Sequence, residues 1–375
     1  MQRSLCEITK AHLDLETRSP LDLTKVGVYR YVEDPDTSIW LFSYRFDAGP
    51  IQRWRPGERA PDALLEHIAS GGPVVAHNAN FERQIWNAVV RRLAGCEGWP
   101  RLNIAQCDCT MSRALAVHLP ANLEELAGVL GLPEQKDKEG RRLMLQMAKP
   151  RKCNPDGTFV WWDEPEKIER LADYCDQDVL TECAVDAKLP PLSADERDLW
   201  ELDQRINDRG FALDVESIHR CLAVLEVAQE RANARMAELT GGYVKKITEA
   251  TRIVEWLKGR GVPAASIAKT EQSELLSWTD TLGDETATEV IRLRAEAGRS
   301  STAKFKTMLL IVCADGRARG QLNYHRASTG RWGGELVQPH NLPRVSEAEE
   351  LAVAGAMEIM SETADLSHGS HLEET

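Results

Sequence analysis

Four short segments near the N-terminus alternate apolar and polar residues, and this pattern constrains the fold more than any other feature. The segments are Ala11–Glu16, Val26–Val32, Ser38–Phe46 and Ile51–Trp54. Turn-forming stretches, EDPDT and DAGP, separate the later ones. Alternation with a period of two residues is typical of strands that bury one face. The sequence therefore predicts an antiparallel meander at the start of the chain.

Helical patterns follow this region. Apolar residues spaced three and four apart predict four helices, and a short apolar run predicts one more strand. The helices are Asp62–Ser70, Phe81–Leu93, Leu123–Leu132 and Pro165–Leu189, and the strand is Val74–His77. Residues 134–157 are polar and interrupted by Gly and Pro, so we expect a loop there. Strands mixed with helices predict an α/β fold for residues 1–190.

A boundary is predicted at KLPPLS, residues 188–193. Its two prolines end a helix, and Ser193 stands three residues before Glu196, which is the capping-box spacing of a new helix. A mainly helical region is expected over residues 191–344, with helices at Asp195–Arg209, Val215–Leu239, Ile247–Arg260 and Asp284–Cys313. Residues 345–375 are rich in acidic and small residues, so we expect a disordered tail.

Composition narrows the class of protein. The chain has 375 residues, 42% of them hydrophobic, and no apolar run approaches the roughly 18 residues of a membrane span. Its N-terminus lacks the apolar core of a secretory signal. Nine cysteines, an odd number with no C-x-x-C pair, fit a reducing compartment. We therefore expect a cytoplasmic protein with no membrane partner.

Cysteine spacing gives little support for a zinc site. Cys107 and Cys109, with His118 nearby, match no common zinc module. We interpret both cysteines as small buried thiols.

The charge distribution is uneven. The net charge is −13, which by itself argues against a polyanionic partner. Between Arg292 and Arg344, however, ten Lys or Arg residues face three acidic ones. A cationic stretch of this kind can hold phosphate groups on an otherwise anionic protein.

Acidic residues recur at three places in the first 190 residues. Asp14 and Glu16 lie at i and i+2 of a predicted strand, so both side chains project from one face. Glu82 stands in the predicted first turn of a helix that follows a buried strand. Tyr174 and Asp178, at i and i+4, share one face of a later helix. Each of the three motifs alone is interpreted most simply as polar residues on a solvated surface. The three motifs in this order, however, are a specific combination.

This combination resembles the proofreading 3′-5′ exonucleases that carry four acidic residues and a tyrosine on a ribonuclease-H-like fold, a mixed sheet flanked by helices. The motifs are D-x-E at Asp14, N-x-x-F-E from Asn78 and Y-x-x-x-D at Tyr174. The resemblance implies a catalytic set of Asp14, Glu16, Glu82, Tyr174 and Asp178. The family usually has Asp where this chain has Glu82.

The resemblance also implies a metal centre. Two Mg²⁺ or Mn²⁺ ions about 4 Å apart would be held by Asp14, Glu16, Glu82 and Asp178. Asp14 would bridge both ions, Glu82 would support the second, and Tyr174 would orient the attacking water. Asn78 and Phe81 are implied contacts to the terminal nucleotide of a single-stranded DNA 3′ end.

The second half resembles family-A DNA polymerases of the phage-type branch. LSADERDLWELDQRINDRGFALD, from Leu192, is similar to the beginning of their polymerase region. Residues 298–344 are similar to their thumb-to-palm segment, including T-G-R at Thr329–Arg331. Lys304, Arg326 and Arg331 are the implied contacts to a primer-template. The resemblance implies a bacterial or phage-encoded protein.

The later palm aspartates and the fingers helix of that family have no counterpart in the chain. We therefore expect a 3′-5′ DNA exonuclease joined to a thumb-like helical region and the start of a polymerase palm. Two alternatives stay open at this point. One is a DNA-binding polymerase fragment with an inactive exonuclease site, and the other is an RNA-trimming nuclease of the same superfamily. Protein partners are left open by the sequence.

Overall fold

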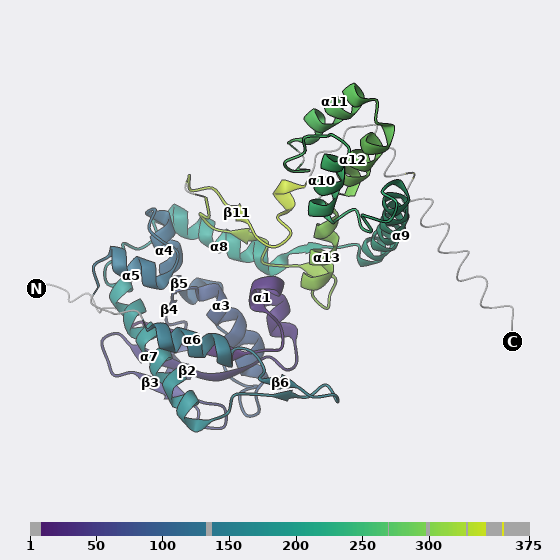
Figure 1. The fold of residues 1–375 in the computed structure, drawn as a ribbon. Helices are drawn as coiled ribbons and strands as arrows, with labels where there is room; N and C mark the ends of the chain where they lie inside the picture. Colours follow the sequence, from purple (N-terminus) through teal and green to yellow (C-terminus); the bar gives the residue numbers. More distant parts are fainter. Residues whose placement is uncertain are drawn as a thin grey trace, which may run out of the picture. The chain divides into compact units, whose positions relative to one another are not determined.

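The computed structural model describes residues 9–132, 137–268, 270–297, 301–327, 329–342 and 355. Contacts divide the chain into two compact units (Figure 1). The first consists of residues 1–213 and 310–341, and the second of residues 214–309 and 342–375. These units reflect packing, so the functional division at residue 190 stays a prediction. The expected disorder of residues 345–375 lies outside the described residues, apart from Gly355.

A five-stranded mixed sheet forms the centre of the first unit. Its strands are β1 (Ala11–Arg18), β2 (Ser38–Phe46), β3 (Gln52–Trp54), β4 (Val74–Ala76) and β5 (Cys107–Cys109), in the order β3-β2-β1-β4-β5. Strand β1 pairs antiparallel with β2 and parallel with β4. Leu13 and Leu15 enter the main hydrophobic core from β1, as the alternation predicted. The sequence did not predict β5, which is only three residues long.

The predicted strand at Val26–Val32 is wrong, because these residues lie in helix α1 (Leu23–Glu33). Asp22 caps α1 by accepting from the backbone of Thr24, and the helix buries Val26, Tyr29 and Val32, three residues apart. Valine at alternate positions imitated a strand, while burial follows the helical period.

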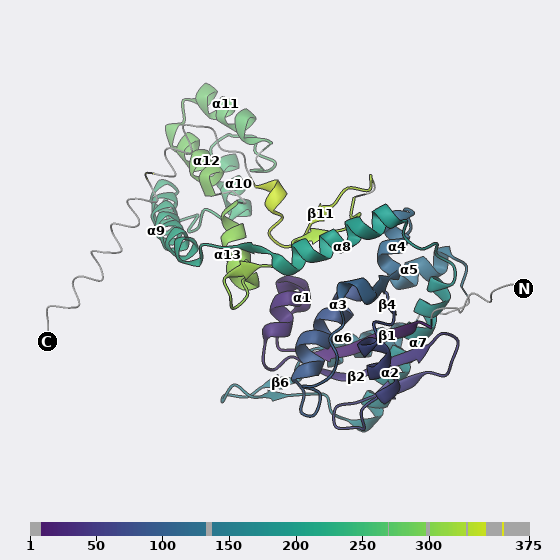
Figure 2. The ribbon, with the colours of Figure 1, turned by 180° about the vertical axis from the view of Figure 1, so that it is seen from behind.

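Further helices and a hairpin complete the region around the sheet. They are α2 (Asp62–Ala69), α3 (Ala79–Gln84), α4 (Thr110–Ala116), α5 (Leu123–Val129), α6 (Lys138–Met147), β6 (Lys152–Cys153), β7 (Phe159–Val160) and α7 (Pro165–Asp186). Helix α7 packs across β1 and β2 (Figure 2). A π-helical turn, Ile85–Val89, and a 3₁₀ turn, Val90–Arg92, extend α3. Another 3₁₀ turn, Ile104–Gln106, precedes β5.

The expectation of a loop over residues 134–157 is wrong where α6 forms. Asp137 caps this helix at the backbone of Gly140, and Met147 is fully buried at its end. The polar composition that suggested a loop belongs to the solvent face of an amphipathic helix.

Elements from the polymerase-like part also belong to the first unit. They are α8 (Ala194–Arg209), β8 (Phe211–Ala212), β9 (Arg317–Ala318), β10 (Leu322–Asn323), β11 (Gly333–Gly334) and a 3₁₀ turn, Pro339–Asn341. Asp208 of α8 accepts hydrogen bonds from Tyr29 and from Arg83, which lies in α3. This contact fastens α8 to the helices beside the sheet.

The second unit is helical. It contains α9 (Val215–Leu239), α10 (Ala250–Gly259), α11 (Gln272–Leu282), α12 (Glu285–Ala297) and most of α13 (Ser301–Ile311). The single helix predicted over Asp284–Cys313 is two helices, and α11 was not predicted. Ile253, Leu257 and Ile291 are central in the core of this unit. Among the described helices, none is long and apolar enough to cross a membrane.

Candidate active site

Strand β1 presents two acids to α7. Asp14 and Glu16 project from the face opposite Leu13 and Leu15, and Glu16 is only 6% exposed. The thiol of Cys175, in α7, donates to Asp14 Oδ2 at 3.2 Å and to the Asp14 carbonyl at 3.4 Å. Asp14, Glu16 and Cys175 each have one potential metal-ligand atom, a carboxylate oxygen or the sulfur, and these three atoms lie within 4.8 Å of one another. The i, i+2 spacing on the strand therefore produces a compact acidic pair.

Helix α7 adds a tyrosine and a third acid. The Tyr174 hydroxyl donates a hydrogen bond to the Asp178 carboxylate, one helical turn further on. Electrostatic repulsion from Asp178 reaches both Asp14 and Glu16, so the three carboxylates are neighbours.

Glu82 completes the group from the first turn of α3. Its side chain is 5% exposed, and its buried Oε2 atom has no hydrogen-bond partner among the residues that the structure describes. Because an unpaired buried carboxylate oxygen is costly, this atom is positioned for a ligand that supplies positive charge.

These side chains surround one cavity of about 470 Å³. Asp14, Glu16, Glu82, Tyr174 and Asp178 all line it, as do Asn78 and Phe81. The opposite wall is largely apolar and includes Leu21, Leu23, Tyr31, Met144 and Leu145, with Lys149 beside them. All seven residues that the sequence placed near the exonuclease site thus line the same cavity.

Burial and mutual repulsion control the charges of the acids. Burial raises the pKa of Asp14, Glu16 and Glu82 well above the ordinary range, and the neighbouring carboxylates raise each further. The pKa of Asp178 rises to about 6, chiefly through burial, while the Tyr174 hydrogen bond opposes this rise. Burial, with the charge of Asp178, also raises the pKa of Tyr174, which stays protonated.

This donor set fits Mg²⁺ or Mn²⁺. The four carboxylates offer oxygen ligands, and Glu82 Oε2 bonds to none of the described residues. Burial, reinforced by the charges of Asp14 and Glu16, raises the pKa of Cys175 well above its usual value. Cys175 is therefore a thiol that donates to Asp14 rather than a thiolate ligand for zinc.

Two buried residues near these acids were not predicted from the sequence. His12 Nδ1 and Glu182 Oε2 form a buried hydrogen bond of 2.6 Å, and the charge of Glu182 raises the pKa of both Asp14 and Glu82. The signal was available, because His12 precedes Asp14 by two residues on the same strand face and Glu182 follows Asp178 by one helical turn.

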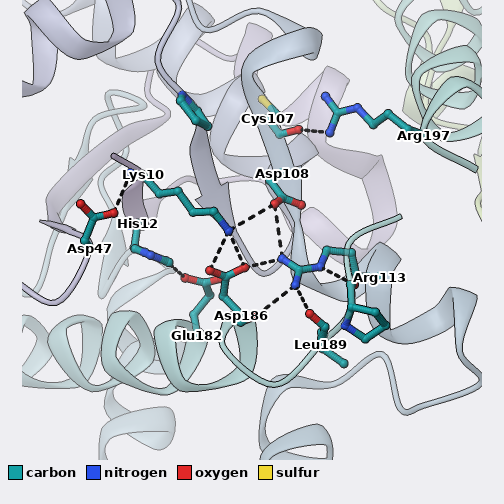
Figure 3. A network of polar contacts seen from close by, with 12 residues as sticks. Lys10, His12, Asp47, Cys107, Asp108, Arg113, Glu182, Asp186, Leu189 and Arg197 are labelled. Atoms are coloured by element: carbon teal, nitrogen blue, oxygen red, sulfur yellow. Dashed lines mark hydrogen bonds and ion pairs between the residues drawn. The ribbon is translucent and has the colours of Figure 1, made fainter. Parts of the chain in front are cut away.

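A charged network holds α7 against β5 and α4 (Figure 3). Asp186, at the end of α7, binds Arg113 and also Lys10, the latter at 3.0 Å. Arg113 further contacts Asp108 at 3.3 Å and donates to the carbonyls of Asp186 and Leu189. The network fixes the helix that carries Tyr174 and Asp178.

The remaining sequence-predicted residues lie elsewhere. Cys107 and Cys109 are buried, as expected for small thiols. Arg326 lines a different, smaller cavity, and Arg331 is exposed beyond it in the segment that follows β10. Lys304 is in α13, within the second unit. The proposed DNA contacts of Lys304, Arg326 and Arg331 stay predictions.

Comparisons with known proteins agree with this architecture. The chain is 37% identical over 353 residues to a DNA polymerase of Bacillus phage SP02; the alignment covers 91% of this chain and 52% of the phage protein. The fold is similar to that of the POL domain of Pol1 from M. smegmatis, solved in complex with DNA primer-template and dNTP. That match has a TM-score of 0.52 and 15% identity, and covers 92% of this chain and 54% of that one. The chain spans about half the length of both proteins, and no family model matches it.

Proposed function

We propose that the first unit is a metal-dependent 3′-5′ DNA exonuclease, working as part of a family-A DNA polymerase in replication. One observation carries this proposal: four carboxylates and a tyrosine converge on a single cavity, and no described residue bonds to the buried Oε2 atom of Glu82 there. The mixed sheet flanked by helices supports a ribonuclease-H-like fold. Similarity to a phage DNA polymerase supports the replication context.

The four carboxylates and Tyr174 would have different roles in the proposed hydrolysis. Asp14, Glu16, Glu82 and Asp178 would hold the divalent cations, which neutralise charge on the phosphodiester and make water more acidic when bound. Tyr174 keeps its proton, which Asp178 accepts as a hydrogen bond, so the phenol oxygen is free to accept from a water molecule. That arrangement would orient the attacking water.

The substrate would occupy the rest of the cavity. Phe81 and the apolar wall around Leu145 offer surface to an unstacked terminal base, while Asn78 provides polar contacts. Lys149, which is exposed at the cavity and lies 3.5 Å from Asp22, would meet a backbone phosphate.

Digestion of a 5′-labelled single-stranded DNA oligonucleotide tests the proposal. We expect products shortened from the 3′ end with Mg²⁺ and none with EDTA. A matched RNA oligonucleotide should be cut more slowly. Faster cleavage of RNA would overturn the assignment of DNA as substrate, and an intact DNA substrate with Mg²⁺ would overturn the nuclease itself.

The glutamate at position 82 favours a second candidate function, which is DNA binding by a polymerase fragment with an inactive exonuclease site. Its side chain is one methylene longer than the aspartate usual in the resembling family. Comparing the natural chain with Glu82→Asp separates the two candidates. Activity in the natural chain supports the exonuclease, whereas activity only in Glu82→Asp supports the inactive site.

A further inference from the structure

A second cavity, of about 120 Å³, lies elsewhere in the first unit. Its walls come from the turn after β4, from α4, from α8 and from the β10 segment. Asn78 lines this cavity and also the one that holds the carboxylates, so the two share a wall. The proposed exonuclease function does not account for the second cavity.

Two residues that line the second cavity are buried and carry acceptor atoms. Asp203 and Gln204 of α8 are 2% and 5% exposed, and neither Asp203 Oδ1 nor Gln204 Oε1 has a hydrogen-bond partner within the described part of the chain. The other carboxylate oxygen of Asp203 accepts from the amides of Gln204 and Asn207, each at 3.1 Å. One edge of the carboxylate is thus held by the protein, while two acceptor oxygens still lack donors.

The remaining walls suit a planar, partly apolar ligand with a phosphate. Trp200, Leu115 and Leu322 supply apolar surface. Arg326 lines the same cavity and is exposed, and no ion pair involving it is found among the described residues. An arginine in this position can bind a phosphate in bidentate fashion.

We propose that this cavity binds one unstacked nucleotide, with its base against Asp203 and Gln204 and its phosphate on Arg326. Two unpartnered acceptors select a base that carries an exocyclic amino group. Cytosine offers such a donor, whereas thymine presents a carbonyl oxygen at the same position. The proposal concerns binding alone and does not depend on hydrolysis at the carboxylate cavity.

Oligonucleotides of dC and dT provide the matched test, because both bases are pyrimidines. Their affinities for the full chain can be compared by fluorescence anisotropy in EDTA at pH 8, where hydrolysis is suppressed and Asp203 is ionised. We expect oligo-dC to bind about tenfold more tightly than oligo-dT, the effect of one hydrogen bond to a charged acceptor. Equal affinities would overturn the proposal.

Asp203→Asn sharpens the test. The amides of Gln204 and Asn207 already donate to one side of residue 203, so the new amide would keep its oxygen there and turn its NH₂ toward the base. A donor would replace an acceptor, and the preference for dC over dT should vanish or reverse. The exposed Asp198→Asn, on the same helix, is the control and should retain the preference. An unchanged preference in Asp203→Asn would contradict the proposal.

Leu115→Trp provides a variant that fills the cavity without touching the polar groups. It should weaken binding of oligo-dC about tenfold and binding of oligo-dT much less.

Competition by free dCMP distinguishes the source of the nucleotide. Displacement of oligo-dC by dCMP but not dTMP would indicate a site for free mononucleotides, while displacement by neither would indicate a nucleotide within a strand. Equal displacement by both would contradict base selection.

Discussion

Asp14, Glu16 and Glu82 share one small volume, and their mutual repulsion destabilises the folded chain. A bound cation would relieve this repulsion, and binding to the folded state alone stabilises it. We therefore expect saturating Mg²⁺ or Mn²⁺ to raise the melting temperature by about 4 °C relative to EDTA.

Asp14→Asn tests whether this shift comes from the acidic cluster. The variant should melt at a higher temperature than the natural chain in EDTA, because one buried negative charge is gone. It should then gain little from the cation. An equal gain in both proteins, measured by differential scanning calorimetry, would place the cation elsewhere.

Asp203 carries a separate stability prediction. Burial is the main reason that its pKa rises to about 7, whereas the unfolded value is near 4. The folded chain therefore binds a proton that the unfolded chain has released, and the free energy of unfolding falls as pH rises from about 4 to 7. Asp203→Asn should remove this dependence and stabilise the protein at pH 8 by about 2 kcal/mol.

Urea denaturation of both proteins at pH 5 and pH 8 measures this difference. Asp198→Asn is the control, since an exposed carboxylate should change stability by less than about 0.5 kcal/mol. If Asp203→Asn were less stable than the natural chain at pH 8, Asp203 would be serving the fold rather than a ligand.

The resemblance of three short motifs identified the residues around the main cavity, but their chemical environment could not be predicted. Cys175 bonds to Asp14 because α7 crosses β1, and this crossing is set by packing between distant segments. Asp203 was not singled out from the sequence, because the cavity that it lines also needs β10, more than 100 residues later in the chain. Contacts over such separations leave no local pattern.

Among elements, the polar network at the end of α7 should be important for stability. The Asp186 carboxylate is largely buried, and its bonds to Arg113 and Lys10 lower its pKa in spite of burial. Arg113→Met would leave the Asp186 carboxylate with Lys10 alone and would remove the donor to three backbone carbonyl groups, so we expect a loss of about 3 kcal/mol. Arg59→Met, which removes an exposed pair with Asp62, should cost less than about 1 kcal/mol. Equal losses in urea denaturation would show that the network is no stronger than a surface pair.

The sign of the pH effect follows from the lowered pKa of Asp186. Its stabilising contribution is present above the unfolded value near 3.8 and is lost as pH falls toward the folded value. The difference between the natural chain and Arg113→Met should therefore shrink in acid.

Gly210 controls how α8 joins β8. Its φ is +59°, and a Cβ atom there would lie 2.2 Å from the carbonyl oxygen of Ala318 in the paired strand β9. Gly210→Ala should destabilise the first unit by about 2 kcal/mol or more. At Gly241, with a similar φ of +60° and open space, alanine should cost only about 1 kcal/mol. Equal costs in urea denaturation would mean that backbone strain alone matters.

Element prediction succeeded where a segment had one clear period. β1, β2 and α7 have 8, 9 and 22 residues, long enough for their patterns to be recognised in the sequence. Alternating valines led to the prediction of a strand where α1 forms. Solvent-exposed polar residues led to the prediction of a loop where α6 forms. Strand β5 has three residues, too few to define a period.

At the scale of the whole molecule, two units arise from one chain that leaves the first unit at residue 213 and returns to it at residue 310. The five-stranded sheet, α8 and the T-G-R segment therefore belong to one packed body, and the functional division at residue 190 stays a prediction. The chain spans about half the length of the phage DNA polymerase to which it is similar.

The most direct measurement is the rate at which 3′-terminal mononucleotides leave a single-stranded DNA oligonucleotide in Mg²⁺. The natural chain, Asp14→Asn and the exposed control Asp36→Asn should be compared after circular dichroism shows all three to be folded. We expect Asp14→Asn to lose at least about 100-fold in rate, while Asp36→Asn keeps full activity. Equal rates for the natural chain and Asp14→Asn would show that the carboxylate cavity is not the nuclease site.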